Sequence, residues 1–305
     1  MNSIISFVRR IQLYFTVMYP WFNALLLSTV MVMSVKAIYL NDIQLSEHVY
    51  FAIFSVFLAF LLLRTYDELK DTEVDKIAFP NRPLVTGLIH YKDVKLINLT
   101  AFILLIIINL NKEAATSFFL LFLSFTVLSW QWWLFPKTVS NSFFLTFITH
   151  QPLVFLLLLY IMAMHSFDKN LPIYIEKAVV IAFVYWLPFI IWEIARKIRA
   201  PEQEDRYLSY SKRWGLERAL AVIKFLTLVD FMLIITIWYW LDMPWIFLLL
   251  YLLLTVALVV YLWRFSRKRN KDGNHVKLAG EIYLILYYFI PWLVKGTVHN
   301  SVSFL

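Results

Sequence analysis

Five carboxylates lie close together between Asp67 and Asp75. Asp67, Asp71 and Asp75 are spaced four residues apart, so a helix would carry them on one face, which Glu68 can join. Like charges at this spacing destabilise a helix by roughly 0.2–0.5 kcal/mol per pair, and a divalent cation would offset that cost. Oxygen ligands with open coordination positions suit Mg²⁺ that also binds phosphate. The alternative, a solvated acidic helix end, leaves the one-face spacing beside an apolar helix unexplained.

A proline-rich turn follows the acidic residues, with the sequence Pro80-Asn81-Arg82-Pro83-Leu84. The two prolines stop the helix and stiffen the turn. Arg82 is therefore predicted to lie near the acidic face, where its guanidinium could contact a phosphate through two hydrogen bonds. A structural salt bridge or an anchor at the membrane interface is the alternative for this arginine.

Membrane helices are the elements that would carry these residues. Of the 305 residues, 61% are apolar and 16% are charged, against about 45–50% and about 25% in soluble domains. The chain has no cysteine, which excludes disulfides, thiolate catalysis and metals held by Cys. Nine apolar segments predict an all-α, polytopic membrane bundle of nine transmembrane helices, in a single domain over residues 1–305. The segments are Leu13–Tyr39, Val49–Tyr66, Val94–Leu110, Ala114–Leu134, Phe143–Met164, Ala178–Ala195, Leu220–Leu241, Pro244–Trp263 and Leu278–Val294.

The distribution of basic residues predicts the orientation. With a cytoplasmic N-terminus, and with Lys36, Arg64 and Lys95 near the segment ends counted with the adjoining loops, the inner stretches hold 22 Lys and Arg and the outer ones hold 5, as the positive-inside rule requires. Lys224, inside the seventh segment, is counted with neither side. The formal net charge of +8 is then explained by cytoplasmic loops, and no basic face with stacking aromatics indicates nucleic-acid binding. We expect a multi-pass integral membrane protein, in the cell membrane if the source is bacterial, with its active site on the cytoplasmic side.

The acidic residues and the proline turn together resemble the UbiA superfamily of intramembrane prenyltransferases, and the count of nine spans matches that superfamily as well. The resemblance implies a helical bundle around a cavity open to lipid, which binds an isoprenoid diphosphate through Mg²⁺ held by two acidic motifs. It assigns Asp67, Glu68, Asp71 and Asp75 to the first metal site. The matching motifs are Asp67-Glu68-x-x-Asp71-x-x-x-Asp75 and Phe79-Pro80-Asn81-Arg82-Pro83-Leu84-x-x-Gly87.

The second acidic motif departs from the pattern of the superfamily. Glu193 begins it and is, by the resemblance, a metal ligand and catalytic residue, but Lys197 stands where a second acid is usual. Either the second metal is lost, or the loop carboxylates Glu202, Glu204 and Asp205 replace its ligands, or basic residues neutralise the diphosphate directly. An ordinary ion pair between Glu193 and Lys197 is the structural alternative.

Basic and tyrosine side chains of the same loop are candidates for diphosphate binding. Arg196, Lys197 and Arg199 carry positive charge on the predicted cytoplasmic side, although such residues are also ordinary anchors at helix ends. Tyr207 and Tyr210 could donate hydrogen bonds to diphosphate oxygens. The alternative for both tyrosines is a place at the membrane interface.

The fourth apolar segment ends in aromatic residues followed by a lysine. Trp133-x-x-x-Lys137 is similar to a Tyr-x-x-x-Lys motif common in the superfamily, and Lys137 is predicted to contact the diphosphate. Trp130 lies one helical turn before Trp133, so both indoles could face a developing carbocation. A snorkelling anchor for Lys137 and an interfacial aromatic belt for the tryptophans are the alternatives.

Polar residues within apolar segments are the remaining candidates. Asn23, His150 and Gln151 are predicted to face the bundle interior and to line a pocket for the acceptor or the cation. Asp230 is an acid within the seventh segment, and no role follows for it from its neighbours in the sequence.

The sequence therefore predicts a Mg²⁺-dependent prenyltransferase. Its substrates would be a prenyl diphosphate and a small hydrophobic or aromatic acceptor, both met in the lipid bilayer. One alternative is a terpene cyclase of the same superfamily, which ionises the same diphosphate and captures the cation internally. The other is a membrane transporter or scaffold without catalytic activity, although a transporter would more naturally place its ion site near the membrane midplane.

Overall fold

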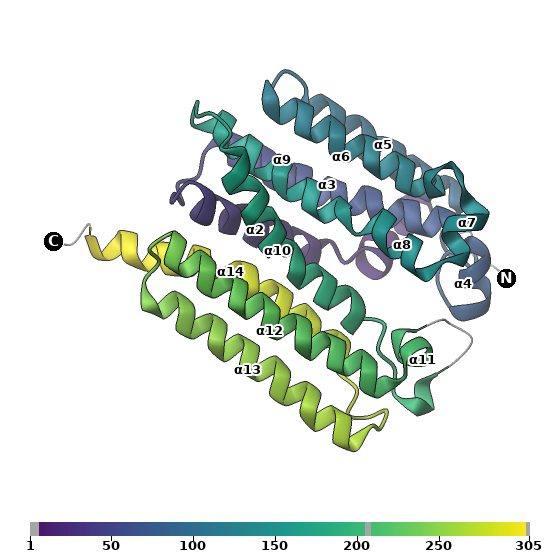
Figure 1. Ribbon diagram of the computed structural model, residues 1–305. Helices are drawn as coiled ribbons and strands as arrows, with labels where there is room; N and C mark the ends of the chain where they lie inside the picture. Colours follow the sequence, from purple (N-terminus) through teal and green to yellow (C-terminus); the bar gives the residue numbers. More distant parts are fainter. Residues whose placement is uncertain (1–5, 205–208, 303–305) are drawn as a thin grey trace. The chain divides into compact units, whose positions relative to one another are not determined.

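The computed structural model describes residues 6–204 and 209–302, and this part of the chain consists of helices and connecting turns without a β-strand (Figure 1). Contacts divide the chain into two compact units, the first of residues 1–32 and 45–171 and the second of residues 33–44 and 172–305. A single domain over residues 1–305 stays a prediction. The long helix α2 (Trp21–Tyr39) begins in the first unit and ends in the second.

The first unit holds the acidic residues and the second holds the basic loop. Helices of the first unit are α1 (Phe7–Leu13), α3 (Glu47–Lys70), α4 (Thr72–Ala78), α5 (Tyr91–Asn109), α6 (Ala114–Trp130), α7 (Pro136–Asn141), α8 (Phe143–His150) and α9 (Pro152–Asp168). Helices of the second unit are α10 (Ile175–Ala195), α11 (Tyr210–Trp214), α12 (Leu216–Trp240), α13 (Trp245–Lys268) and α14 (Val276–Val302).

Helix α3 lies at the centre of the first unit. It packs against α5 and α9, and α9 also packs against α6 (Figure 1). The buried side chain of Asn109 donates to the Ser55 hydroxyl at 3.0 Å and accepts from the Tyr160 hydroxyl at 2.5 Å. Polar groups that lipid cannot satisfy are thereby paired across three helices. This packing holds α3, whose last turn carries the first acidic residues.

The second unit packs α10 against α12 and α14, while α13 also contacts α12 and α14. Helices α10 and α14 approach closely at Gly280, where an added Cβ would lie 2.8 Å from the Cβ of Ala195. At the centre of this unit, the buried carboxyl group of Asp230 accepts hydrogen bonds from the hydroxyls of Tyr283 at 2.6 Å and Tyr287 at 3.0 Å. Close packing and one buried polar cluster therefore hold these helices together.

Seven helical stretches in the described part are long and apolar enough to cross a membrane. They correspond to seven of the nine predicted segments, with α8 and α9 counted as one stretch. Helix α6 is apolar but has 17 residues, fewer than the roughly 20 of a typical span. Helix α5 is not among the seven, and it begins with the charged residues Lys92 and Asp93. The fold class and the membrane character are confirmed, whereas nine spans and a cytoplasmic N-terminus stay predictions.

Three of the predicted segments are wrong as continuous helices, and one of them, Phe143–Met164, is divided at Gln151 into α8 and α9. Leu13–Tyr39 is divided into α1, a π-helical turn at Tyr14–Met18 and α2, because Pro20 has no N–H and its ring moves Tyr19 to a non-helical conformation. In Ala114–Leu134 the helix ends at Trp130, and Trp132–Leu134 form a tight turn with positive φ angles of 52°, 54° and 64°. The sequence shows no glycine there, so this left-handed turn had no local signal.

Candidate active site

The acidic residues lie on two helices rather than on one. Helix α3 ends at Lys70, and Asp71 both ends it and precedes α4, with φ −92° and ψ 15°. The helical hydrogen bonds nevertheless continue across this break, from the Asp71 N–H to the Asp67 carbonyl at 2.9 Å and from the Asp75 N–H to the Asp71 carbonyl at 2.8 Å. The i, i+4 repeat that the sequence predicts is thus retained, although the single helix is not.

Two of the motif carboxylates are buried and paired with arginines. The Glu68 side chain is 1% exposed and its carboxylate lies 2.5 Å from the Arg64 guanidinium, which also donates to the Met18 carbonyl at 3.1 Å. Asp75 is buried and forms an ion pair with Arg82. Burial of a charge is costly unless it is paired, and these arginines provide the pairing.

Asp67 provides an accessible carboxylate at the start of the motif. Its side chain is 55% exposed, and its carboxylate lies 3.9 Å from the Lys70 ammonium. Glu73, between the motif positions, is 82% exposed and pairs with Lys76 at 2.7 Å, and this carboxylate raises the pKa of the lysine. The motif therefore has an accessible end at Asp67 and a buried, arginine-paired part at Glu68 and Asp75.

The proline turn places Arg82 as the sequence predicts. The Arg82 N–H donates to the Phe79 carbonyl at 3.0 Å, and its guanidinium lies over the Phe79 ring at 4.0 Å from the centroid. The Arg82 side chain lies between Asp75 and this ring and is 28% exposed. Gly87, the last residue of the matching motif, has a φ of 76°, a conformation that favours glycine. The turn thus holds a partly exposed arginine beside the acidic residues.

The donor atoms of the acidic motif fit Mg²⁺ in their chemistry. They are carboxylate oxygens, the ligands that Mg²⁺ prefers, and apart from the ion pair with Arg64 both carboxylate oxygens of Glu68 are buried without a hydrogen bond. Across residues 6–204 and 209–302, however, no three His, Asp or Glu side chains lie close enough to hold a metal ion. Arg64 and Arg82 lie against the buried carboxylates in this arrangement, so the assignment of metal ligands stays a prediction.

Lys70 connects the acidic motif to α8. Its ammonium lies 3.0 Å from Nε2 of His150 and over the indole of Trp132, 4.1 Å from the ring centroid. The Nδ1 atom of His150 lies 2.9 Å from the Thr146 carbonyl. Sequence reasoning selected His150 as a polar residue in an apolar segment, but it missed Lys70 and Trp132. The only available signal was the position of Lys70 inside the acidic motif.

The aromatic candidates of the first unit are not arranged as the sequence predicts. Trp130 stacks on Tyr66 at 4.9 Å, while Trp133 donates its indole N–H to the Thr149 carbonyl at 3.2 Å. They are not one helical turn apart on the same face, because α6 ends between them and Trp133 has a φ of 54°. That part of the prediction is wrong.

Three further candidates of the first unit lie at different degrees of exposure. Lys137 is exposed in the first turn of α7, so it does not share a continuous helix with Trp133. Asn23 is exposed near the start of α2. Gln151 is half-buried and stands at the break that separates α8 from α9. The structure brings none of these three against the acidic motif through a described hydrogen bond or ion pair.

In the second unit, Glu193 lies between two cations near the end of α10. Its carboxylate oxygens lie 2.6 Å from Nε of Arg196 and 2.8 Å from Nζ of Lys197. The side chain of Glu193 is 13% exposed, whereas those of Arg196 and Lys197 are 34% and 24% exposed. Lys197 also lies over the buried ring of Tyr210, 5.7 Å from its centroid. The pairing of Glu193 with Lys197 that the spacing allows is present.

The loop carboxylates of the second unit are used to hold the loop itself. Glu204 accepts hydrogen bonds from the hydroxyls of Ser209 and Ser211 at 2.6–2.9 Å, and Glu202 accepts from the Lys271 N–H at 3.1 Å. Arg199 donates to the Gln203 carbonyl at 3.3 Å. Tyr207 and Asp205, also named from the sequence, lie outside the described residues.

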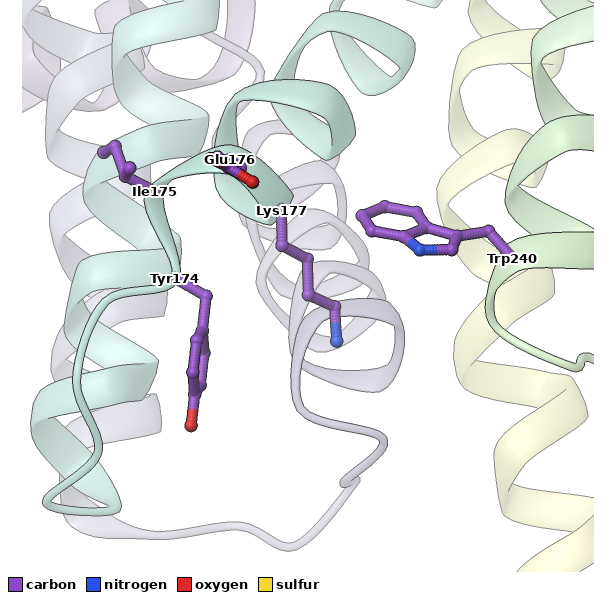
Figure 2. A pocket seen from close by; sticks show the side chains of 5 residues that line it. All are labelled: Tyr174, Ile175, Glu176, Lys177 and Trp240. Atoms are coloured by element: carbon purple, nitrogen blue, oxygen red, sulfur yellow. The ribbon is translucent and has the colours of Figure 1, made fainter.

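A pocket of about 390 Å³ lies at the other end of α10, and its lining comprises Tyr174, Ile175, Glu176, Lys177 and Trp240 (Figure 2). Lys177 donates to the Tyr39 carbonyl at 2.7 Å. With 1.5 Å of rise per residue, the α10 residues Lys177 and Glu193 are separated by about 24 Å along the helix. This pocket is therefore distinct from the cluster around Glu193.

Comparisons with known proteins agree with the sequence motifs. The family model described as the UbiA prenyltransferase family matches residues 25–285. A solved structure described by the words "Structural and mechanistic insights into the biosynthesis of Digeranylgeranylglyceryl phosphate synthase in membranes" is similar, with a TM-score of 0.59 and 16% sequence identity. That match covers 94% of this chain and 98% of the other, and at this identity it is evidence of the fold. The comparison with curated sequences gives no significant match.

Proposed function

The chain belongs to the UbiA prenyltransferase family, and on that premise we propose that it is a Mg²⁺-dependent intramembrane enzyme that transfers an isoprenoid chain from its diphosphate to an aromatic or other small acceptor. The observation that carries this proposal is the acidic motif at the end of α3, with Arg82 beside Asp75. Carboxylates next to a partly exposed arginine suit a metal–diphosphate complex. Membrane helices adjoin this motif, as a substrate with an apolar chain requires.

The acidic motif would hold the metal and Arg82 would bind the diphosphate. Asp67, Glu68, Asp71 and Asp75 are the proposed metal ligands, and Asp67 is accessible while Glu68 and Asp75 are paired with arginines. When bound there, Mg²⁺ would act as a Lewis acid toward the diphosphate oxygens. The positive charge of Arg82 would stabilise the negative charge that the leaving diphosphate gains.

The reaction breaks the bond between carbon 1 of the allylic chain and the bridging oxygen. The electron pair leaves with the diphosphate, and the allylic cation is captured by a nucleophilic atom of the acceptor, which then loses a proton. Asn23, His150 and Gln151 are the proposed contacts of the acceptor, whereas Trp130 and Trp133 are not proposed to face the cation together, because α6 ends between them. An apolar environment that excludes water protects the cation from hydrolysis.

The basic cluster of the second unit would contribute positive charge. Glu193 is already paired with Arg196 and Lys197, and Glu202 and Glu204 hold the loop. Of the three explanations for the altered second motif, direct neutralisation of the diphosphate by basic residues is the one proposed. The proposed contacts of the diphosphate are Arg196, Lys197, Arg199, Tyr210, Lys137 and Tyr207. Glu193 could act as a second metal ligand only if its two paired cations were displaced.

Nine spans, a cytoplasmic N-terminus and an active site on the cytoplasmic side complete the proposal. They are supported by the excess of Lys and Arg in alternate loops of the sequence. The acidic motif and the basic cluster both lie at helix ends that would be on the inner side by this rule.

Release of diphosphate by purified protein in detergent tests the function. Prenyl diphosphates of C10 to C20 are supplied with Mg²⁺, with and without a panel of aromatic acceptors, and the organic phase is analysed. We expect release that depends on an acceptor and yields a prenylated product. A cyclised product formed without acceptor would instead establish a terpene cyclase. No release and no Mg²⁺-dependent binding of unreactive diphosphate analogues would refute the enzyme and leave a transporter or scaffold.

Asp71→Ala and Glu73→Gln are the matched variants for this assay. Asp71 belongs to the motif, whereas Glu73 is two residues away, 82% exposed and paired with Lys76. Loss of one metal ligand is expected to lower kcat/KM by at least about a hundredfold, as for other electrostatic contacts to a leaving group. Glu73→Gln is expected to retain activity, and equal losses in both variants would contradict the assignment of the motif.

A further inference from the structure

The positive charge of Lys70 has little compensation within the first unit. Its side chain is 10% exposed, and the nearest carboxylate, that of Asp67, lies at 3.9 Å. By contrast, Arg10 and Arg64 lie 2.6 Å and 2.5 Å from the carboxylates of Asp93 and Glu68. A largely buried ammonium without a close counter-charge is unfavourable. An anion bound beside Lys70 would therefore be stabilised.

The histidine that contacts Lys70 adds no negative charge. Nδ1 of His150 lies 2.9 Å from the Thr146 carbonyl, which can only accept, so the ring proton belongs on Nδ1. Nε2 then carries the lone pair and accepts from the Lys70 ammonium at 3.0 Å. His150 thus orients one of the three N–H groups of Lys70 and leaves the other donors for a further partner.

The indole that covers Lys70 is held by an unusual backbone. Trp132, Trp133 and Leu134 all have positive φ angles, between 52° and 64°, a conformation that is strained for residues other than glycine. The Thr149 carbonyl secures this turn by accepting from the Trp133 indole at 3.2 Å and from the Ser129 hydroxyl at 2.9 Å. Consecutive strained residues that are over-determined by packing are a feature of functional sites.

We propose that the Lys70 ammonium is a preorganised cation for the diphosphate of the isoprenoid substrate, and that His150 and Trp132 are the residues that position it. This inference rests on the proposed function. The ammonium lies next to Asp67, the accessible end of the acidic motif, where a phosphate bound to the motif would arrive. A lysine acts toward phosphate as a point charge with several donors, and neutral partners hold that charge without cancelling it.

Binding of unreactive substrate analogues to the full-length protein tests the role of Lys70. Calorimetry in detergent with Mg²⁺ would compare C10, C15 and C20 prenyl thiolodiphosphates with the corresponding prenyl alcohols. We expect Lys70→Met to weaken the best thiolodiphosphate by about tenfold to a hundredfold, the range for hydrogen bonds to charged groups. Alcohol binding should change less than about twofold, because an alcohol carries no charge for the ammonium to meet.

Lys76→Met is the matched control. Lys76 lies six residues further along the chain, is 52% exposed and pairs with Glu73, so its removal should change diphosphate affinity less than about twofold. Equal weakening of alcohol and diphosphate by Lys70→Met would show a structural role and overturn the inference. Unchanged diphosphate affinity in Lys70→Met, with binding and turnover by the wild type intact, would overturn this inference alone. No analogue binding by the wild type would overturn the proposed function and this inference together.

Conservative replacement separates positioning from packing at His150. His150→Gln keeps a side-chain oxygen that accepts from Lys70, whereas His150→Phe keeps the ring and removes the acceptor. We expect the phenylalanine variant to lose several-fold affinity for the thiolodiphosphate and the glutamine variant to recover most of it. Equal affinities in the two variants would overturn the positioning role of His150.

Discussion

Replacement of Asp230 with leucine tests what holds the second unit together. The carboxyl group of Asp230 is fully buried in α12 and accepts from two tyrosines of α14, at 2.6 Å from Tyr283 and 3.0 Å from Tyr287. The rings of Tyr287 and Tyr251 lie 4.8 Å apart, and the Tyr251 hydroxyl donates to the Tyr287 carbonyl at 2.8 Å. Leucine would fill similar space but would leave both tyrosine hydroxyls without their acceptor.

The magnitude follows from the two lost hydrogen bonds. A hydrogen bond to a charged group contributes about 1.5–3 kcal/mol in soluble proteins, whereas hydrogen bonds within membrane proteins average about 0.6 and reach about 1.7 kcal/mol. Asp230→Leu should therefore lower the free energy of unfolding by about 2–4 kcal/mol once the unsatisfied hydroxyls are included. Asp230→Asn retains one acceptor oxygen and should cost about 1 kcal/mol.

Unfolding by SDS in mixed micelles measures these differences. Double-mutant cycles with Tyr283→Phe and Tyr287→Phe should show a coupling energy with Asp230 for both tyrosines, larger for Tyr283 because its contact is shorter. Activity per folded molecule should stay close to that of the wild type, since Asp230 is not a proposed site residue. Stability of Asp230→Leu within about 0.5 kcal/mol of the wild type would refute the reasoning.

Three further predictions concern pH, packing and metal. The Arg10 guanidinium lowers the pKa of Asp93, so this carboxylate stabilises the fold above its unfolded pKa of about 3.9 and the benefit is lost as the pH falls through the lower folded pKa. The difference in melting temperature between wild type and Asp93→Asn should therefore start to shrink below about pH 4 and vanish below the folded pKa. Gly280→Ala would place a Cβ 2.8 Å from that of Ala195 and should destabilise the protein by about 1–3 kcal/mol, whereas Gly296→Ala, whose nearest contact would be 3.9 Å, should not destabilise it in the same thermal melt. Chelation with EDTA should abolish diphosphate release and added Mg²⁺ should restore it, and full activity in EDTA would contradict a metal-dependent reaction.

The first half of the candidate site could be predicted because its residues are neighbours in the chain. The spacing of Asp67, Asp71 and Asp75 implies a helical repeat, and their main-chain hydrogen bonds retain it. The proline turn likewise brings Arg82 to Asp75 within a short segment. Local geometry of this kind depends on backbone preferences that act over a few residues.

The contacts of Lys70 could not be predicted, because they join residues far apart in the sequence. His150 is 80 residues away from Lys70 in the sequence. Trp132 contacts Lys70 because it lies in a left-handed turn, and the sequence has no glycine there that would predict such a turn. The break in the first segment, by contrast, could have been predicted from Pro20. The prediction of one continuous helix followed the apolar composition of Leu13–Tyr39 instead.

By itself, the sequence determined the class of this protein: an all-helical membrane protein whose local acidic motif identifies its family. Long apolar runs in lipid favour helices, because a helix pairs every backbone polar group within its own segment. Only the tertiary structure decided which charges are already paired. Arg64 and Arg82 neutralise Glu68 and Asp75, while Lys70 has neutral partners and one accessible carboxylate at 3.9 Å. That distinction arises because the energy of a buried charge depends on which groups the packing brings within a few ångströms.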